Sequence, residues 1–338
     1  MKKTKIKNVL VTGSEGFIGS HLVEKLLNLN YNVKVLVQYN SFNSIGWLSD
    51  IDKDLQKKLN ITFGDLRDPQ CTDELCKNID MIFNLAALIS IPYSYNSTKS
   101  YIDTNIIGTN NILHSAMKFK VKKFIQTSTS EVYGTPKTVP INEDHPLNAQ
   151  SPYAATKIAS DQLALSFHLS FGLPVTVIRP FNTFGPRQSL RAIIPTIIDQ
   201  FIDDKNKLLK LGSISTKRDF NFIDDIVNGF IKTINKNLIN GQVINIGSGK
   251  EYSIKEIIQM VEKITGRSLK LFQEKIRVRP KKSEVQRLLA NNSKALKLLN
   301  WKPKYANKRN FENAIKITID WAKKNKKKGN YKKLEYLF

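Results

Sequence analysis

Residues 9–22 read VLVTGSEGFIGSHL and join a short apolar run to an amphipathic one through three glycines. The apolar run predicts a β-strand over Lys7–Thr12. Apolar residues at helical spacing predict a helix over Phe17–Leu29. A strand, a glycine-rich turn and a helix in this order are typical of the first unit of a dinucleotide-binding α/β sheet, so this stretch decides the fold.

The three glycines follow the spacing Gly13-x-x-Gly16-x-x-Gly19. Gly13 allows a tight turn, Gly16 lets a pyrophosphate approach the backbone, and Gly19 permits close packing of helix on strand. The start of the helix adds free N–H groups and the positive end of a dipole. We therefore expect Gly13, Gly16, Phe17, Ile18 and Gly19 to bind NAD or NADP.

Further strands and helices alternate along the first half of the chain. Strands are expected at Asn32–Val37, Ile61–Phe63, Met81–Leu85, Lys123–Thr127 and Val175–Ile178, and helices at Thr98–Met117 and Pro152–Ser170. This alternation predicts a doubly wound parallel sheet of the Rossmann type.

After Pro180 the pattern loosens. The later elements are expected to be helices near Ala192–Phe201 and Asp224–Ile234, a strand at Val243–Ile246 and a helix over Ile254–Ile264. We therefore expect a dinucleotide-binding domain over residues 1–185, completed by a strand near 242–247. A smaller, interleaved substrate-binding lobe would occupy most of residues 186–338.

The chain has 338 residues and a formal net charge of +24. The excess is mostly lysine spread along the chain, with a dense part over Lys323–Lys333. We interpret it as solvated surface and expect no specific nucleic-acid partner. Cys71 and Cys76 have a spacing that suits neither a zinc ribbon nor a redox pair, and no metal is expected.

The beginning of the chain, MKKTKIKNVLVTG, is basic and then apolar, as a signal peptide is. Its apolar run is too short for export, because it ends in glycine after Thr12. No stretch approaches the roughly 20 apolar residues of a membrane span. We expect a cytoplasmic protein without a membrane partner.

Cofactor choice is normally set where the second strand ends, by an acid for NAD or an arginine for NADP. Here the run Val-Gln38-Tyr-Asn-Ser has neither, so the choice stays open. Asp65 either contacts the adenine or caps a loop. We expect Gln38, Asp65, Leu66 and Ala86 to belong to the dinucleotide site.

The run Tyr153-Ala-Ala-Thr-Lys157 opens a predicted helix and places its two polar side chains one turn apart on one face. A phenol with a pKa near 10 is a poor base at neutral pH. A nearby ammonium would stabilise the phenolate, which could then take a proton from a sugar hydroxyl while hydride leaves the same carbon. Tyr153 and Lys157 are therefore predicted to be catalytic and to contact the nicotinamide ribose.

Several segments together resemble the extended short-chain dehydrogenase/reductases that act on sugar nucleotides. They are TGSEGFIGSHL, FNLAAL, TSTSEVYG, SPYAATK, RPFNTFGPRQ, KRDFNFIDD and VRPKKSEV. The resemblance implies a tightly held, recycled cofactor, with NAD slightly favoured over NADP. It also implies a homodimer formed through the helices expected at Thr98–Met117 and Pro152–Ser170.

Within that family, the triplet Thr129-Ser130-Glu131 resembles the one found in GDP-mannose 4,6-dehydratases. Simple 4-epimerases usually carry small residues where Glu131 stands. The resemblance implies that Glu131 removes the C5 proton and protonates the leaving C6 hydroxyl, while Thr129 bonds the C4 oxygen. UDP-glucuronate decarboxylases share the triplet, so decarboxylation and 4-epimerisation remain alternatives.

The runs KRDF at 217–220 and VRP at 278–280 favour a dehydratase over a decarboxylase by the same resemblance. It implies that the substrate is held by Asn182, Arg187, Arg218, Asn245 and Arg279. The runs YNSFNS and ALI-x-IPYSY are similar to dehydratases of GDP-N-acetylglucosamine in legionaminic acid biosynthesis. The alternative from another class is a non-catalytic nucleotide- or nucleic-acid-binding protein.

Overall fold

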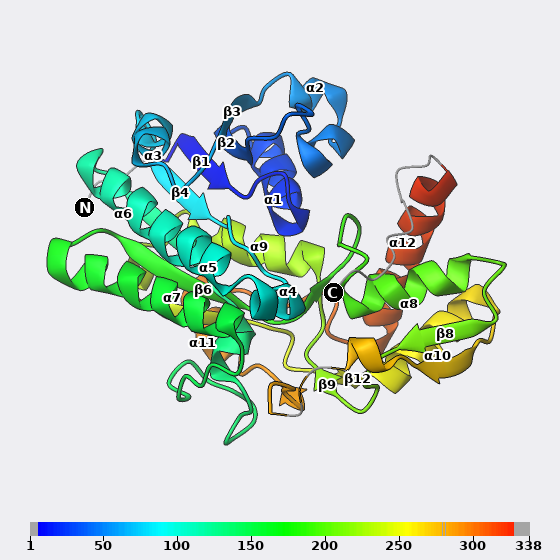
Figure 1. The fold of residues 1–338 in the computed structure, drawn as a ribbon. Coiled ribbons are helices and arrows are strands. Elements are labelled where there is room, and N and C mark those ends of the chain that lie inside the picture. The colour runs from blue at the N-terminus through cyan, green and yellow to red at the C-terminus, as the bar shows by residue number, and fades with distance from the viewer. Residues whose placement is uncertain (1–5, 279, 281, 328–338) are drawn as a thin grey trace.

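The computed structural model describes residues 6–278, 280 and 282–327. Its centre is a seven-stranded sheet in which every pair of neighbouring strands is parallel (Figure 1). In spatial order the strands are β3 (Asn60–Gly64), β2 (Asn32–Gln38), β1 (Asn8–Thr12), β4 (Met81–Asn84), β5 (Lys123–Thr127), β6 (Val175–Pro180) and β11 (Val243–Ile246). The order reverses beside β1, which makes the carboxyl ends of β1 and β4 the expected place for a ligand.

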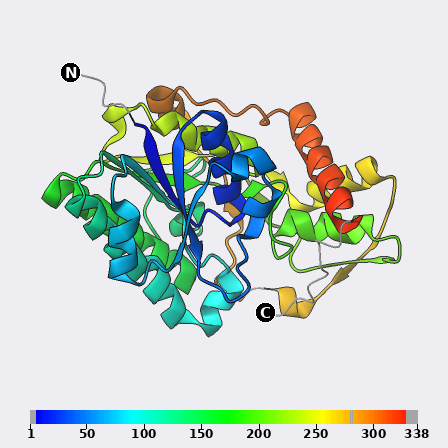
Figure 2. The ribbon, with the colours of Figure 1, turned by 90° about the horizontal axis from the view of Figure 1, so that it is seen from above.

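Helices cover both faces of the sheet, as the view from above shows (Figure 2). Successive side chains of β1 alternate between the faces: Val9 and Val11 belong to one core cluster and Leu10 to the other. The first face is covered by α1 (Phe17–Asn28) and α9 (Ile223–Thr233), and the second by α3 (Pro69–Cys76), α6 (Gly108–Lys118) and α7 (Pro152–Phe171). The predicted doubly wound sheet is confirmed.

The smaller lobe contains the helices α8 (Ile193–Ile202), α10 (Ile254–Thr265) and α12 (Lys308–Lys327), which lie to one side of the sheet in Figure 1. Its strands are short. In the described residues, β8 (Leu208–Leu211) pairs with β13 (Lys270–Gln273), and β7 (Thr183–Phe184) pairs with β10 (Asn221–Phe222). A three-stranded sheet contains β9 (Lys217–Arg218), β12 (Tyr252–Ser253) and β14 (Arg287–Leu288). None of these strands was predicted, because runs of two to four residues carry no readable alternation.

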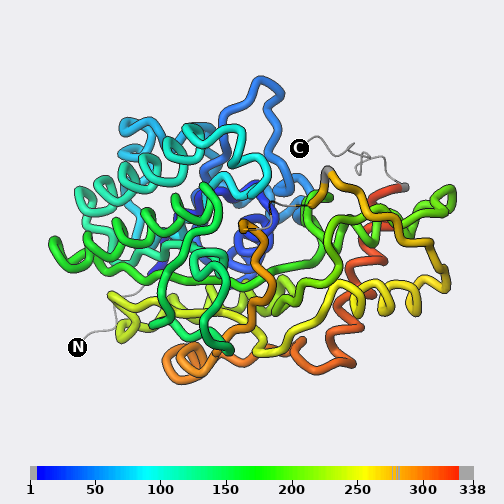
Figure 3. The backbone as a smooth tube through the Cα atoms, turned by 60° about the horizontal axis from the view of Figure 1, so that its bottom comes forward, coloured from blue at the N-terminus to red at the C-terminus, as the bar shows by residue number. Residues whose placement is uncertain are grey.

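The chain passes from the smaller lobe back to the sheet after β14 and forms α11 (Ser293–Leu299), as the tube in Figure 3 lets the reader follow. It then returns to the smaller lobe as α12. Part of the lysine-rich end is therefore an ordered helix, whose Ile315, Ile319 and Ala322 are buried. Lys323 and Lys324, at the described end of this helix, are exposed, as solvated surface requires. In the described part of the chain no helix is both long and apolar enough to cross a membrane.

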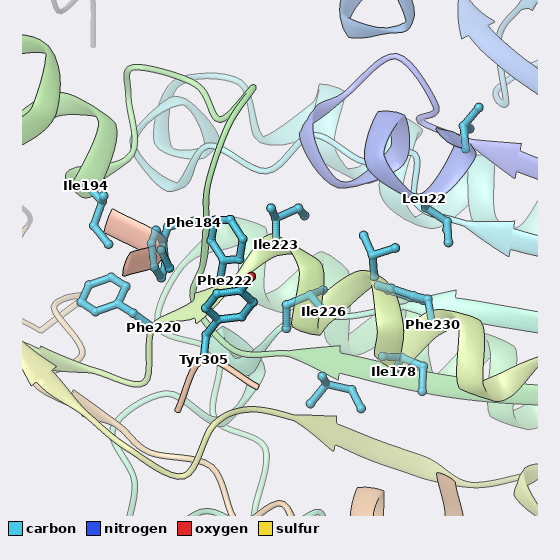
Figure 4. Packing of buried hydrophobic residues seen from close by; sticks show 14 of the residues in the cluster. Leu22, Ile178, Phe184, Ile194, Phe220, Phe222, Ile223, Ile226, Phe230 and Tyr305 are labelled. Atoms are coloured by element: carbon cyan, nitrogen blue, oxygen red, sulfur yellow. The ribbon is translucent and has the colours of Figure 1, made fainter. Parts of the chain in front are cut away.

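One core joins the two parts of the molecule through α9 (Figure 4). Phe230 packs edge-on against Phe83 of the sheet, with 6.1 Å between ring centroids. At the other end, Phe222 packs against Tyr305 of the smaller lobe at 4.6 Å. Because buried side chains of both parts share this cluster, the walls of the space between them are held in place.

The helix expected over Thr98–Met117 is interrupted. It consists of α5 (Thr98–Tyr101), a π-helical turn at Ile102–Ile107, and α6. Asn105 in this turn is buried, and its side chain accepts from the amide of Leu88 at 2.8 Å and donates to the carbonyl of Leu88 at 3.0 Å. The turn thus holds the segment that follows β4.

The other short helical elements are α2 (Lys53–Gln56), α4 (Ile91–Asn96) and single turns at Gly46–Asp50, Ser130–Tyr133, Asn237–Ile239 and Lys275–Arg277.

Candidate active site

A cavity of about 1180 Å³ lies between the carboxyl ends of the sheet strands and the smaller lobe. This exceeds the roughly 300–1,000 Å³ of ordinary small-molecule pockets. Its lining comes from the β1–α1 loop, the segments after β2, β4, β5 and β6, the start of α7, and the smaller lobe near Arg218. The position is the one where doubly wound sheets bind dinucleotides.

The glycine loop is shaped for close approach. Gly13 has φ +63°, and a Cβ there would lie 2.8 Å from the amide nitrogen of Ala86. A Cβ on Gly19 would lie 2.1 Å from the carbonyl oxygen of Gly13, so the helix can pack on the loop only without a side chain. Helix α1 begins at Phe17. Among the described residues, no side chain caps its first amides with a hydrogen bond, and its first turn contains no acidic residue. Free amides at the start of a helix bind phosphate oxygens, so this loop fits the pyrophosphate of a dinucleotide.

The predicted cofactor residues Phe17, Ile18, Gln38, Leu66 and Ala86 all line the cavity, together with Asp65 and the three glycines. Arg67 holds the Asp65 carboxylate through its guanidinium, and this hydrogen bond lowers the pKa of Asp65. The residues at this end of the cavity therefore fit a dinucleotide.

Tyr153 and Lys157 come from the first turns of α7 and line the cavity. Ser151 caps this helix by accepting from the amide of Ala154 at 3.1 Å, and Pro152 occupies the first turn, where its missing N–H costs nothing. Lys157 Nζ donates to the carbonyl oxygen of Thr127 at 2.6 Å. The helix start and the end of β5 thus meet at this pair of side chains.

Thr129 and Glu131 stand on the turn that follows β5 and line the same wall as Tyr153. Burial raises the pKa of Tyr153, a hydrogen bond with Thr129 opposes the rise, and the charge of Glu131 adds to it. Among the described residues no hydrogen bond engages the Glu131 carboxylate, while its backbone amide donates to Thr129 Oγ1 at 3.2 Å. The structure therefore brings the four predicted catalytic residues, Thr129, Glu131, Tyr153 and Lys157, into one group.

Behind this group lies a buried polar network that the sequence analysis did not detect. Asp161 Oδ2 accepts from Ser128 Oγ at 2.6 Å and from Arg179 Nη2 at 3.1 Å. Burial lowers the pKa of Lys157 to about 8, and the Asp161 charge opposes that change. The spacing of Asp161, one turn after Lys157 on the same helix, was the available signal.

Arg179 extends the network through Tyr133. Its Nη1 donates to the Tyr133 hydroxyl at 3.0 Å, and that hydroxyl donates to Asn245 Oδ1 at 2.7 Å. The side-chain Nδ2 of Asn245 donates to the carbonyl oxygen of Ile141 at 3.1 Å. Asn245 is fully buried and does not belong to the described lining of the cavity. Strand β11 turns this side chain into the network.

Three other predicted substrate residues, Asn182, Arg187 and Arg218, line the cavity. Arg187 pairs with Glu24 of α1 at 2.8 Å, and Arg218 pairs with Glu284 at 3.2 Å. Among the described residues, Asn182 Oδ1 and Arg187 Nη1 are buried without a hydrogen-bond partner. Such groups are costly unless a ligand satisfies them, which fits a polar substrate. Arg279 lies outside the described residues.

No group of three or more His, Cys, Asp or Glu side chains within the described ranges is arranged to hold a metal ion.

Comparisons with known proteins identify the family of the chain. The family model of GDP-mannose 4,6 dehydratase matches residues 10–316. The UDP-glucuronate 4-epimerase of Thermodesulfobacterium geofontis is 32% identical over 94% of this chain and 96% of that protein.

Two solved structures share the fold over nearly the whole chain. The UDP-glucuronic acid 4-epimerase of Bacillus cereus, in complex with UDP-glucuronic acid and NAD, has a TM-score of 0.83 and 30% identity, covering 94% of this chain and 99% of that one. The dTDP-glucose 4,6-dehydratase of Streptomyces venezuelae, with NAD bound, has a TM-score of 0.82 and 28% identity, covering 95% of this chain and 98% of that one. The chain therefore belongs to the GDP-mannose 4,6-dehydratase family of nucleotide-sugar-modifying enzymes.

Proposed function

We propose that the protein is an NAD-dependent 4,6-dehydratase of a GDP-sugar, with GDP-N-acetylglucosamine as the expected substrate and legionaminic acid biosynthesis as the expected context. The observation that carries the proposal is the position of the Glu131 carboxylate. Glu131 lines the same cavity as Tyr153, and its charge adds to the rise in the pKa of that phenol. Oxidation needs one base, and removal of water needs a second acid–base group beside it.

Tyr153 would take the proton of the C4 hydroxyl, with Lys157 stabilising the phenolate and Thr129 bonding the oxygen. A dinucleotide held by the glycine loop, Gln38, Asp65, Leu66 and Ala86 would supply a hydride acceptor for oxidation at C4 and a hydride donor for reduction at C6. Because the C4 ketone acidifies the C5 proton, Glu131 could remove that proton. Glu131 would then give it to the C6 hydroxyl, which leaves as water, and the proton that Tyr153 took from the C4 hydroxyl would end on C5 and restore the phenolate. The product is the 4-keto-6-deoxy sugar.

Arg218 and Arg187 would bind the substrate pyrophosphate, since guanidinium groups bind phosphate oxygens with two parallel hydrogen bonds. Arg279 is proposed to share this task on the strength of the family resemblance. Asn182, whose Oδ1 is buried and unpaired among the described residues, would accept a hydrogen bond from the substrate.

The test is incubation of the purified protein with GDP-N-acetylglucosamine and, separately, with UDP-glucose and UDP-glucuronate. Mass spectrometry should show a GDP-sugar product lighter by one water, with no net production of NADH. A product of unchanged mass would instead establish 4-epimerisation, the activity named for several relatives. Release of carbon dioxide from UDP-glucuronate would establish decarboxylation.

We also propose a homodimer packed through α6 and α7. Leu169 and Phe171, near the end of α7, are exposed to 83% and 57%, and Ile107, just before α6, to 45%. Sedimentation velocity should give twice the mass of one chain. Leu169→Glu should shift the protein toward the monomer, and a monomeric wild-type protein would overturn this proposal.

A further inference from the structure

Glu15 supplies a carboxylate where the end of β2 lacks one. It lies on the β1–α1 loop, between the first two glycines of the motif. Its Oε1 accepts a hydrogen bond from the backbone amide of Gln38, the last residue of β2, at 2.9 Å. Both residues line the large cavity. In dinucleotide folds, the acid that binds the adenosine ribose normally stands at the end of β2 itself.

The second oxygen of this carboxylate has no internal use. Glu15 Oε2 is buried and has no hydrogen-bond partner among the described residues. A buried carboxylate oxygen without a donor is costly, so the arrangement indicates a ligand that brings a hydroxyl donor.

The backbone of Glu15 is held by the loop after β2. The amide of Trp47 donates to the Glu15 carbonyl at 3.0 Å. Gly46 has φ +52°, and a Cβ there would lie 2.7 Å from that same oxygen, so the loop touches Glu15 directly. The side chain is therefore presented from a braced main chain, as a specificity-determining group requires.

The described lining at this end of the cavity offers no cation to a phosphate. Between residues 36 and 66 the described lining contributes Asp50 and Asp65 and neither lysine nor arginine. Arg67 is close in sequence, but Asp65 holds its guanidinium. A ribose 2′-hydroxyl could donate to Glu15, whereas a 2′-phosphate would be repelled.

From these contacts we infer that Glu15 binds the adenosine ribose of the dinucleotide and selects NAD against NADP. The inference rests on the cofactor named in the proposed function but not on whether the reaction is dehydration.

The experiment measures the dissociation constants of NAD⁺ and NADP⁺ by calorimetry, without sugar nucleotide. Wild-type protein should bind NAD⁺ at least about tenfold more tightly than NADP⁺. Glu15→Gln keeps an acceptor for the Gln38 amide and removes the charge, so the preference should fall by about tenfold. Asp54→Asn is the matched control, because it removes an exposed carboxylate outside the cavity lining and should leave the ratio unchanged.

An unchanged ratio in Glu15→Gln, or wild-type protein that binds the two dinucleotides equally, would overturn the inference. If Glu15→Gln does not fold, binding of 2′-deoxy-NAD⁺ to wild-type protein serves instead: without the hydroxyl donor it should bind about tenfold more weakly than NAD⁺, and equal dissociation constants would overturn the inference. Binding of neither dinucleotide to wild-type protein would overturn the proposed cofactor as well. A product of unchanged sugar mass would overturn only the proposed dehydration.

Discussion

Lys157 Nζ donates a 2.6 Å hydrogen bond to the carbonyl oxygen of Thr127, which attaches helix α7 to the end of strand β5. This contact fixes the ammonium beside the Tyr153 phenol while burial depresses the lysine pKa to about 8. The lysine is therefore charged at neutral pH and loses its proton under mildly alkaline conditions.

The first prediction concerns the alkaline limb of the pH profile. The turnover number should fall as pH rises above about 8, because neutral Lys157 no longer stabilises the phenolate. The Asp161 charge raises the lysine pKa, so Asp161→Asn should move this limb to lower pH. Initial rates across neutral and alkaline pH check this, with circular dichroism to verify folding. A limb that stays in place would exclude Asp161 as the electrostatic partner.

The second prediction separates oxidation from loss of water. Glu131→Gln should lower dehydration by about 10²–10⁴-fold, since the second acid–base group is lost. Oxidation at C4 should persist, so the absorbance of reduced nicotinamide should build up when substrate is added. Tyr153→Phe is the comparison and should abolish both signals. Undiminished water loss by Glu131→Gln would refute the proposed role of the carboxylate.

The third prediction concerns recognition of the pyrophosphate. Arg218→Lys should raise KM by about tenfold and change kcat little, because an ammonium cannot reproduce the two parallel hydrogen bonds of a guanidinium. Arg287→Lys on the adjacent strand β14 is the matched control, since Arg287 pairs with Glu251 and does not belong to the described cavity lining. Equal steady-state constants for the two variants would contradict the assignment.

The fourth prediction concerns stability. Asp219 is fully buried and accepts from the amides of Ser248, Gly249 and Ala290. Asp219→Ala would leave these donors unsatisfied and should lower the free energy of unfolding by about 3 kcal/mol or more. Asp204→Ala, at a side chain that is 97% exposed, should change it by less than about 0.5 kcal/mol. Urea denaturation of both variants measures the difference.

The sequence predicted those parts of the molecule in which a short stretch determines its own geometry. Gly19 lies against the carbonyl oxygen of Gly13 in the glycine loop, and Tyr153 and Lys157 lie one turn apart on α7. In both pairs the sequence spacing alone sets the relative position of the two residues. Strands β1, β4 and β11 were readable because each is a mostly buried apolar run.

The parts that spacing could not reveal depend on residues far apart in the chain. Arg179 meets Tyr133 only because two strands and a turn converge, and Asn245 joins them from β11. Glu15 was hidden for the same reason, since its relation to Gln38 exists only when β1 and β2 lie side by side. The two-residue strands of the smaller lobe likewise form through pairing between distant segments.

The late position of β11 in the chain has a consequence for biosynthesis. Strand β6 pairs with β11 on its outer edge, yet Val243–Ile246 leaves the ribosome only after helices α8 and α9 have been translated. Until then the nascent sheet exposes a row of unpaired amides and carbonyls, which is a template for aggregation. Chaperone demand during translation should therefore be highest while residues 181–242 are being made.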